Sequence, residues 1–282
     1  MWKKLTGIFG LMAWFSVAAA AQPVADTLRL ETVAIHLDHA AAIYAVGNEQ
    51  VYVVESGRHR LLKLSSNGQR LDSLGNQGFG NYQFDQPVDI DATNGLKIYV
   101  SDQNNNRIQV FDRRFQYLAS IQAGGAPIPA NRYIPGRLTV NRMGELFFYD
   151  DDSDSIIRYG INGEYRGHFP IRDDDRLNIP ADLASVGDKL LLADPAQGVI
   201  HVLSSNGPYI RFIGGLKGVH ALSIYGGSIW ALTEDRLVQL DSRGRLQSGK
   251  WLPASEGKKF VDLSVYDGRV YLLTRDAVYR AY

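Results

Sequence analysis

Apolar and polar residues alternate in short runs along most of the chain, and turn residues separate the runs. The segment from Gly78 to Ile121 shows this pattern most clearly. Its alternation predicts four strands, over residues 88–92, 97–101, 107–112 and 116–121. Turn sequences such as Thr93-Asn94-Gly95 and Arg113-Arg114 connect them. A four-stranded antiparallel unit cannot bury both of its faces alone, so this unit must stack against similar ones.

The same pattern recurs along the chain, which predicts a repeat architecture. The first strand of each unit begins near Ala42, Asp89, Arg137, Asp182, Ala221 and Asp262. These starts lie roughly 44 residues apart, a spacing typical of propeller blades.

The last unit is incomplete, because the chain reaches Tyr282 within its third strand. An alternating segment over residues 27–37 precedes the first unit and has no partner of its own. If this segment supplies the missing outer strand, the ring closes and leaves no open sheet edges. The sequence therefore predicts an all-β fold: a six-bladed β-propeller of four-stranded antiparallel blades, closed by an N-terminal strand that completes the last blade.

The beginning of the chain has the features of a secretory signal peptide. Lys3 and Lys4 precede an apolar stretch from Leu5 to Val17, and small residues follow at 19–21. This stretch is shorter than the about 20 residues that a membrane-spanning helix needs. We therefore expect a signal peptide over residues 1–21, a short linker over 22–26 and the propeller over 27–282. The mature protein would be periplasmic or secreted and would have no transmembrane segment; an uncleaved anchor is the alternative.

Residues 83–112, QFDQPVDIDATNGLKIYVSDQNNNRIQVFD, resemble the NHL repeat. That repeat has Gln-Phe before a Pro, an Ile-Tyr-Val-x-Asp strand and an Asn-x-Arg-Ile-x-Val strand. The resemblance implies a six-bladed propeller. It leaves the activity open, since NHL-like propellers include binding scaffolds, extracellular sensor domains, RNA-binding modules and a zinc-dependent lyase.

The composition excludes several classes of chemistry. The chain has 30 basic and 30 acidic residues, and this balance gives no electrostatic signal for a nucleic-acid partner. It has no Cys, so thiol nucleophiles, disulfides and thiolate metal sites are excluded. There is no nucleophile-elbow motif and no His pair at helical metal-binding spacing. We therefore predict no catalytic residue.

Four charged residues replace the Gly that the NHL pattern favours near the start of the first strand. They are Asp89, Arg137, Asp182 and Asp262. We expect them to ring one mouth of the central channel, where three carboxylates could hold Ca²⁺ or another divalent cation, or a cationic or sugar-like ligand. Alternatively, Arg137 pairs with a neighbouring Asp and only neutralises the channel, which is the interpretation that the sequence favours. His39 and His220 lie near other first-strand starts and are further candidates for ligand binding.

A second acidic segment, DDDSDS, contains Asp150, Asp152 and Asp154 and should lie near Asp173 to Asp175. It resembles a calcium loop only in part, because the loop's Gly and distal Glu are missing. The sequence favours a solvated acidic surface over a second cation site.

Two acid–Arg pairs recur at the same place in neighbouring blades: Asp102 with Arg107, and Glu55 with Arg60. Each pair flanks the turn between the second and third strands. A carboxylate there can accept hydrogen bonds from turn amides, so we predict a structural role.

These features favour an exported, non-catalytic binding propeller that presents its channel mouth and the surrounding loops to a ligand or partner. The expected partner is an envelope or extracellular protein or a glycan, and the expected state is a monomer. The alternative is a metal-dependent hydrolase or lyase, lactonase-like or amidating-lyase-like, with a divalent cation at the channel mouth. The one cofactor candidate is Ca²⁺ or another divalent cation.

Overall fold

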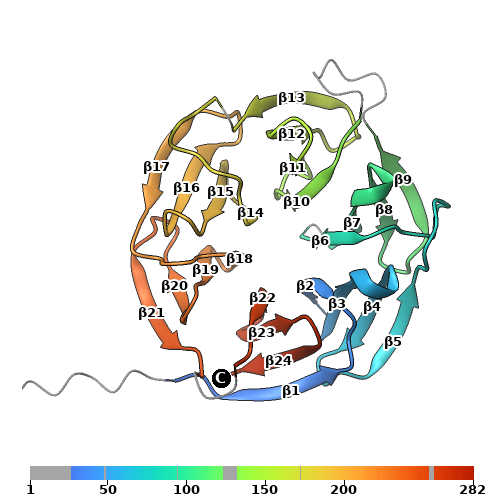
Figure 1. Cartoon of the computed structure of the whole chain (residues 1–282), viewed down its shortest axis with the longest axis horizontal. Helices are drawn as coiled ribbons and strands as arrows, with labels where there is room; N and C mark the ends of the chain where they lie inside the picture. The colour runs from blue at the N-terminus through green and yellow to red at the C-terminus, as the bar shows by residue number, and fades with distance from the viewer. Residues whose placement is uncertain (1–26, 48, 94, 123–131, 172, 254–256) are drawn as a thin grey trace, which may run out of the picture.

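The computed structural model describes residues 27–47, 49–93, 95–122, 132–171, 173–253 and 257–282. Six four-stranded antiparallel sheets stand around a central channel like the blades of a propeller (Figure 1). The predicted fold class is therefore confirmed. The predicted signal peptide (1–21) and linker (22–26) lie outside the described residues. Within those residues, no helix is both long enough and apolar enough to span a membrane.

The first three blades follow one another along the chain, each running from the channel outward. Blade 1 contains β2 (Ala40–Val46), β3 (Gln50–Glu55), β4 (Arg60–Ser65) and β5 (Arg70–Leu74). Blade 2 contains β6 (Pro87–Asp91), β7 (Lys97–Asp102), β8 (Arg107–Asp112) and β9 (Tyr117–Ile121). Blade 3 contains β10 (Pro135–Val140), β11 (Leu146–Asp150), β12 (Ser155–Tyr159) and β13 (Tyr165–Pro170). Short 3₁₀ turns, η1 (Ser56–Arg58) and η2 (Gln103–Asn105), connect the middle strands of the first two blades.

The remaining blades continue the same order around the ring. Blade 4 contains β14 (Asp182–Val186), β15 (Lys189–Asp194), β16 (Val199–Ser204) and β17 (Tyr209–Ile213). Blade 5 contains β18 (Ala221–Tyr225), β19 (Ser228–Leu232), β20 (Arg236–Leu240) and β21 (Leu246–Trp251). Blade 6 contains β22 (Phe260–Tyr266), β23 (Arg269–Thr274) and β24 (Ala277–Ala281) from the end of the chain, with β1 (Leu30–Ile35) as its outer strand.

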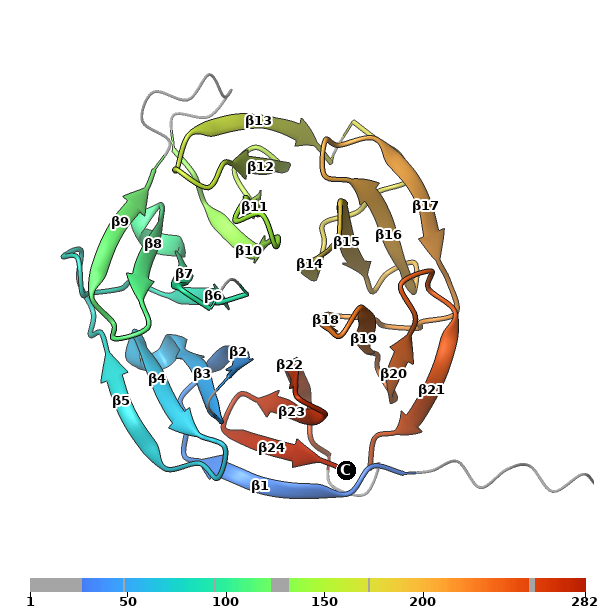
Figure 2. The same cartoon turned by 180° about the vertical axis from the view of Figure 1, so that it is seen from behind.

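The N-terminal strand closes the ring as the sequence predicts. β1 pairs antiparallel with β24, from Leu30 opposite Ala281 to Ile35 opposite Ala277. Glu31 strengthens the junction, because its carboxylate accepts bonds of 2.6 Å from Arg280 and from the Tyr282 hydroxyl. The two ends of the described chain therefore lie in one blade, which Figure 2 shows from the opposite face.

The hydrophobic core lies between the blades. Each middle strand packs against a neighbouring blade on both faces, so its buried residues do not alternate with exposed ones. β7, for example, has Ile98, Tyr99 and Val100 buried in succession. The outer strands are much more exposed, as in β5. The inner three strands of each blade therefore form most of the core, and the first of them also lines the channel.

Candidate functional site

The four charged residues predicted for the channel lie together on first strands, but inside the channel rather than at its mouth. Asp89, Asp182 and Asp262 are buried and line a cavity of about 630 Å³. Arg137 lines a separate cavity of about 460 Å³ that is surrounded by the loops where the first strands begin. The four side chains therefore form a partition between two cavities at opposite ends of the channel.

The carboxylates of this partition hold neighbouring blades together. In each of the three, one oxygen accepts the backbone N–H of a first-strand residue in the next blade at 2.7 Å. The pairs are Asp89 with Leu138, Asp182 with Leu222 and Asp262 with Ile43. The other carboxyl oxygen of Asp182 and of Asp262 accepts the N–H of the following residue at 2.8 Å. Blades 2, 4 and 6 are thus each hydrogen-bonded to the next blade through one of these carboxylates.

Arg137 forms an ion pair with Asp89 and interacts electrostatically with Asp182 and Asp262. Arg137 Nη1 lies 3.5 Å from Asp89 Oδ1, and its Nε donates to the Ala181 carbonyl at 3.1 Å. The geometry agrees with the interpretation that Arg137 pairs with a neighbouring Asp. Burial raises the pKa of Asp262 to about 7 and raises the pKa of Asp182 well above its usual range, since one cation cannot offset three desolvated carboxylates.

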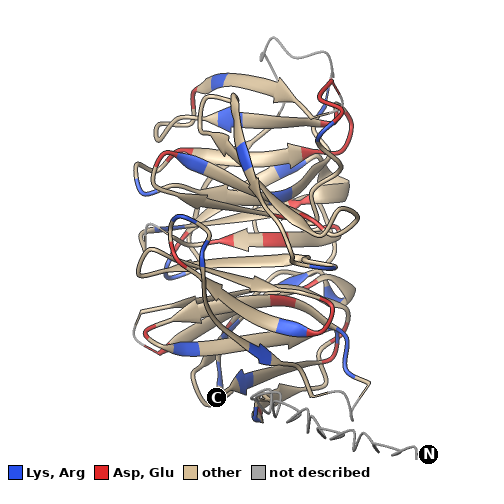
Figure 3. Ribbon diagram, turned by 90° about the vertical axis from the view of Figure 1, so that its left-hand side faces the viewer, with Lys and Arg blue, Asp and Glu red and all other residues tan. Residues whose placement is uncertain are grey.

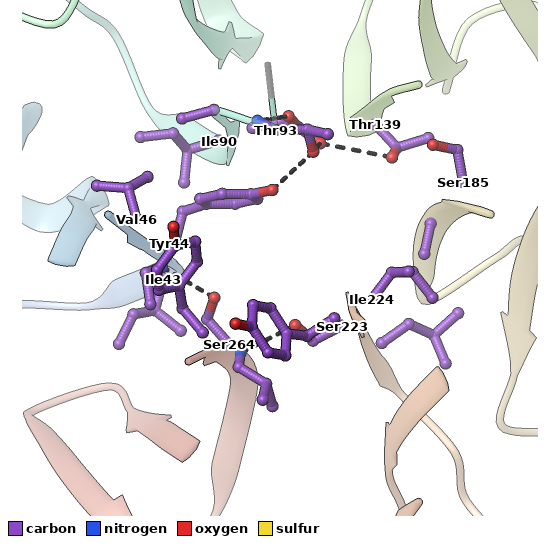
Figure 4. A pocket seen from close by; sticks show the side chains of 18 of the residues that line it. Ile43, Tyr44, Val46, Ile90, Thr93, Thr139, Ser185, Ser223, Ile224 and Ser264 are labelled. Carbon is purple, nitrogen blue, oxygen red and sulfur yellow. Dashed lines mark hydrogen bonds between the residues drawn. The ribbon is translucent and has the colours of Figure 1, made fainter. Parts of the chain in front are cut away.

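The larger cavity is surrounded by the turns where the first strands end, and hydroxyl groups are its commonest polar feature. Figure 4 shows the hydroxyl side chains of Tyr44, Thr93, Thr139, Ser185, Ser223 and Ser264 around one space. Several are fixed in place: Ser223 Oγ accepts the Val265 N–H and Ser264 Oγ accepts the Ala45 N–H, each at 2.9 Å. We call this space the hydroxyl-lined cavity.

Asp91 is a buried residue of this cavity that the sequence analysis missed. Its carboxylate accepts the Thr93 N–H at 2.7 Å and the Val140 N–H of the next blade at 3.0 Å. Burial raises its pKa to about 6. A signal for it was present, because Asp91 follows Asp89 by two residues on one strand and must face the same side.

The two candidate histidines do not meet at the partition. His39 lines the smaller cavity with a 70% exposed side chain, and its Nδ1 lies 2.7 Å from Asp38 Oδ1. His220 instead bridges blades 5 and 6, with Nδ1 2.8 Å from the Gly218 carbonyl and Nε2 3.0 Å from the Phe260 carbonyl. The structure therefore places His39 at one mouth of the channel and His220 between two blades.

The acidic segment after β11 is bonded mainly to protein donors. Asp150 is buried and accepts the Ile134 N–H at 2.6 Å, and Asp154 accepts the Tyr149 hydroxyl at 2.6 Å. Asp152 lies 3.8 Å from Arg132. Across the described ranges, no three His, Asp or Glu side chains are grouped closely enough to hold a metal ion. A cation at Asp150, Asp152 and Asp154, or at the three partition carboxylates, stays a prediction.

The recurrent acid–Arg pairs connect the turn after the second strand to the loop before the same blade. Asp102 accepts Arg107 Nε at 2.8 Å and the Asp85 N–H at 2.8 Å, so it ties the turn after β7 to the loop that precedes blade 2. Glu55 does the same in blade 1, bonding Arg60 and the Asp38 N–H. None of these four residues lines either cavity, which is consistent with the predicted structural role.

Comparison with known proteins agrees with this architecture. The family model described as "NHL repeat" matches residues 84–111. The human NHL repeat-containing protein 3 is 30% identical over 82 residues, which is 28% of this chain and 24% of that protein. The chain therefore matches about a quarter of that relative's length.

Similar solved structures extend the agreement over most of the chain. A streptogramin B lyase structure has a TM-score of 0.65 at 11% identity, covering 91% of this chain and 98% of that one. A catalytically inactive His-to-Ala variant of virginiamycin B lyase from Staphylococcus aureus, with quinupristin, has a TM-score of 0.64 at 12% identity, covering 90% and 98%. A nidogen/laminin complex has a TM-score of 0.58 at 17% identity, covering 75% and 79%.

At these identities the solved structures show a shared fold and nothing finer. The chain therefore carries an NHL repeat in blade 2 and folds as a six-bladed β-propeller.

Proposed function

We propose that this propeller is an exported, non-catalytic binding protein and that its ligand site is the hydroxyl-lined cavity. The observation that carries the proposal is the cavity itself. It measures about 630 Å³, within the range of small-molecule sites, and the buried carboxyl groups of the partition, Asp89, Asp182 and Asp262, lie at its inner end. A ligand would enter from the mouth formed by the turns at the ends of the first strands.

The chemistry of the lining supports binding over catalysis. None of the described residues that line this cavity is a His. Its Ser223 and Ser264 hydroxyls accept backbone N–H groups of the next blade, and among the described residues neither is hydrogen-bonded to a His or a carboxylate that could activate it as a nucleophile. Its carboxylates are likewise engaged by backbone N–H groups. Such groups suit a fixed pattern of hydrogen bonds to a ligand better than the exchange of protons during a reaction.

The alternative is a metal-dependent hydrolase or lyase that uses a divalent cation at the partition. The partition carboxylates keep spare lone pairs that could accept a cation, because each oxygen uses only one backbone N–H. A calorimetric titration of Ca²⁺ and Zn²⁺ into EDTA-treated protein distinguishes the two functions. Binding that the triple variant Asp89→Ala/Asp182→Ala/Asp262→Ala loses would favour the enzyme.

Export and the type of partner belong to the same proposal. The signal-like segment over residues 1–21 supports a periplasmic or secreted location, where a glycan, a small metabolite or an envelope protein would be available. The mass of the mature protein tests export, which predicts a chain beginning at Gln22. Recovery of the chain with residues 1–21 attached would contradict cleavage.

A cavity-blocking variant tests the binding site directly. Ser185 lines the cavity, so Ser185→Trp should fill part of it, whereas Ser73→Trp puts the same side chain on the exposed outer strand of blade 1. We would screen the wild type and both variants by thermal shift against monosaccharides, uronic acids and amino acids. At least one class should stabilise the wild type and Ser73→Trp but not Ser185→Trp. Equal responses from all three proteins would overturn the cavity as the site.

A further inference from the structure

The mouth of the hydroxyl-lined cavity carries its positive charge on one side. Arg113 reaches the cavity from the turn between β8 and β9, Arg142 from the turn between β10 and β11, and Lys97 from the start of β7. All three belong to blades 2 and 3. In side view, charged residues of both signs occur at both faces of the ring (Figure 3), so the one-sided basic wall is a local feature of this cavity.

Two of these cations, Arg113 and Arg142, are accessible to a ligand. Arg113 and Arg142 are exposed, and no carboxylate within the described part of the chain forms an ion pair with either. Their turns are fixed by acceptor side chains. Asp112 Oδ1 accepts the Arg114 and Gln116 N–H groups, each at 2.8 Å, and Asn141 Oδ1 accepts two N–H groups across the other turn. The backbone that carries both guanidinium groups is therefore fixed in position.

The acidic groups of the cavity lie deeper. The four carboxyl groups that line it are all buried on first strands, at Asp89, Asp91, Asp182 and Asp262. Burial raises the pKa of each, so near neutral pH they carry less negative charge than four free carboxylates would. The mouth is therefore basic, while the inner end carries the buried carboxyl groups.

The wall opposite the two arginines suits a ligand with many hydroxyl groups. Tyr225 and Tyr266, from blades 5 and 6, have ring centroids 5.3 Å apart and both line the cavity. Blades 5 and 6 face blades 2 and 3 across the channel (Figure 1). Ser223 and Ser264 each accept a backbone N–H and keep a hydroxyl hydrogen to donate. Aromatic faces beside such donors and acceptors complement a sugar ring.

We propose that the ligand of the hydroxyl-lined cavity is an acidic saccharide of the uronic acid type. Its carboxylate binds Arg113 and Arg142 at the mouth, and its hydroxylated ring enters between the tyrosine pair and the serines. This inference rests on the proposed binding function and adds the chemical class of the ligand. Arginine is the suitable residue for such a contact, because its planar guanidinium can bond both carboxylate oxygens.

Matched sugars and matched arginines test this proposal. D-glucuronate and D-glucose differ at one carbon, a carboxylate against a hydroxymethyl group, and so do D-galacturonate and D-galactose. We would titrate each into the wild type, Arg113→Gln/Arg142→Gln and Arg114→Gln by calorimetry. Arg114 is the control because it neighbours Arg113 in the same turn, is exposed and does not line the cavity.

At least one acid should bind the wild type with roughly tenfold or greater preference over its neutral counterpart, as expected for a charge-assisted bidentate contact. The double variant should lose that preference, and Arg114→Gln should keep it. If the neutral sugar binds as tightly as the acid, or if the double variant keeps the preference, the inference is wrong while the binding cavity stands. If neither acid binds, the ligand class is wrong. If Ser185→Trp binds the acid unchanged, the cavity itself is not the site.

Discussion

Two sets of buried carboxylates recur through the blades, and they have different surroundings. The strand-end acids lie at the end of the second strand of blades 1 to 4; they are Glu55, Asp102, Asp150 and Asp194. The channel acids lie on first strands of alternate blades; they are Asp89, Asp182 and Asp262. Strand-end acids are bonded within their own blade and the loop before it, whereas channel acids bond the next blade and share one cation.

The difference shows that a repeated acid is not by itself a sign of function. Asp194, a strand-end acid, keeps its pKa below the usual value despite burial, because backbone and side-chain donors surround it. Asp182, a channel acid, has its pKa raised well above the usual value by burial and by the nearby carboxylate of Asp262. A buried acid with several hydrogen-bond donors around it, such as Asp194, therefore stays ionised and supports the scaffold. A buried acid that shares one cation with other carboxylates, such as Asp182, can change its charge.

Arg107→Met should be the most damaging single change of this comparison. It removes the cation from buried Asp102 and also the bonds from Arg107 Nη2 to the Gly80 and Gln83 carbonyls. Leaving a buried carboxylate unpaired costs about 3–5 kcal/mol. Urea denaturation measures the loss. The double variant Asp102→Asn/Arg107→Met should recover part of it, and a double variant no more stable than the single one would contradict the pairing as the cause.

Arg137→Met should destabilise the ring by an amount that depends on pH. Without the guanidinium, Asp89, Asp182 and Asp262 can remain buried only by taking up protons, which is easier in acid. We expect a loss of about 2–4 kcal/mol near pH 8 and at least about 1 kcal/mol less near pH 5. Arg114→Met, at an exposed position outside the channel, is the control, since its small cost should not change over the same range. A pH-independent cost for Arg137→Met would show that the channel acids do not act as a titrating group.

The wild type should lose stability as the pH rises from about 5 to about 8, and Asp262→Asn should lose less. The pKa of Asp262 is raised to about 7 in the folded protein, against about 3.9 for Asp in an unfolded chain. The folded state therefore binds more protons between these values, so the stabilisation is complete in acid and disappears as the pH passes about 7.

We expect the two pH profiles to diverge by about 1–2 kcal/mol over this range. Denaturation midpoints at several pH values measure the divergence. Asp72→Asn, on the exposed strand β5, should follow the wild type. If the wild type and Asp262→Asn lose stability in parallel, Asp262 is not the group whose titration causes the pH dependence.

The fold could be predicted from sequence because each strand is set locally. Alternation and turn residues gave the strands of blade 2 to within one residue, from Pro87–Asp91 to Tyr117–Ile121. Ring closure followed from the repeat, which lacked one strand at its end and had a spare one at its beginning.

The site was only partly predictable because it depends on contacts between blades. Their shared position in the repeat predicted that the channel acids lie together. Their hydrogen bonds could not be predicted, because they depend on how the blades pack; Asp89, for example, accepts the N–H of Leu138, which lies 49 positions away. The direction of His39 was equally hidden, since its backbone is left-handed with φ of 49°. Arg113 lies in a turn outside the first strands, so no inward pattern marked it as a wall of the cavity.

Arg60→Met should have the smallest effect and tests whether a spare cation explains the comparison. Glu55 in blade 1 bonds both Arg58 and Arg60, whereas among the described residues Asp102 in blade 2 forms an ion pair with Arg107 alone. Arg58 should keep Glu55 paired after the substitution, so we expect a loss of about 1 kcal/mol or less by urea denaturation. Removing both cations, in Arg58→Met/Arg60→Met, should approach the cost of Arg107→Met. If the double variant instead costs little more than Arg60→Met, backbone donors such as the Asp38 N–H are sufficient to hold this carboxylate, and the arginines of the strand-end acids are not what distinguishes them from the channel acids.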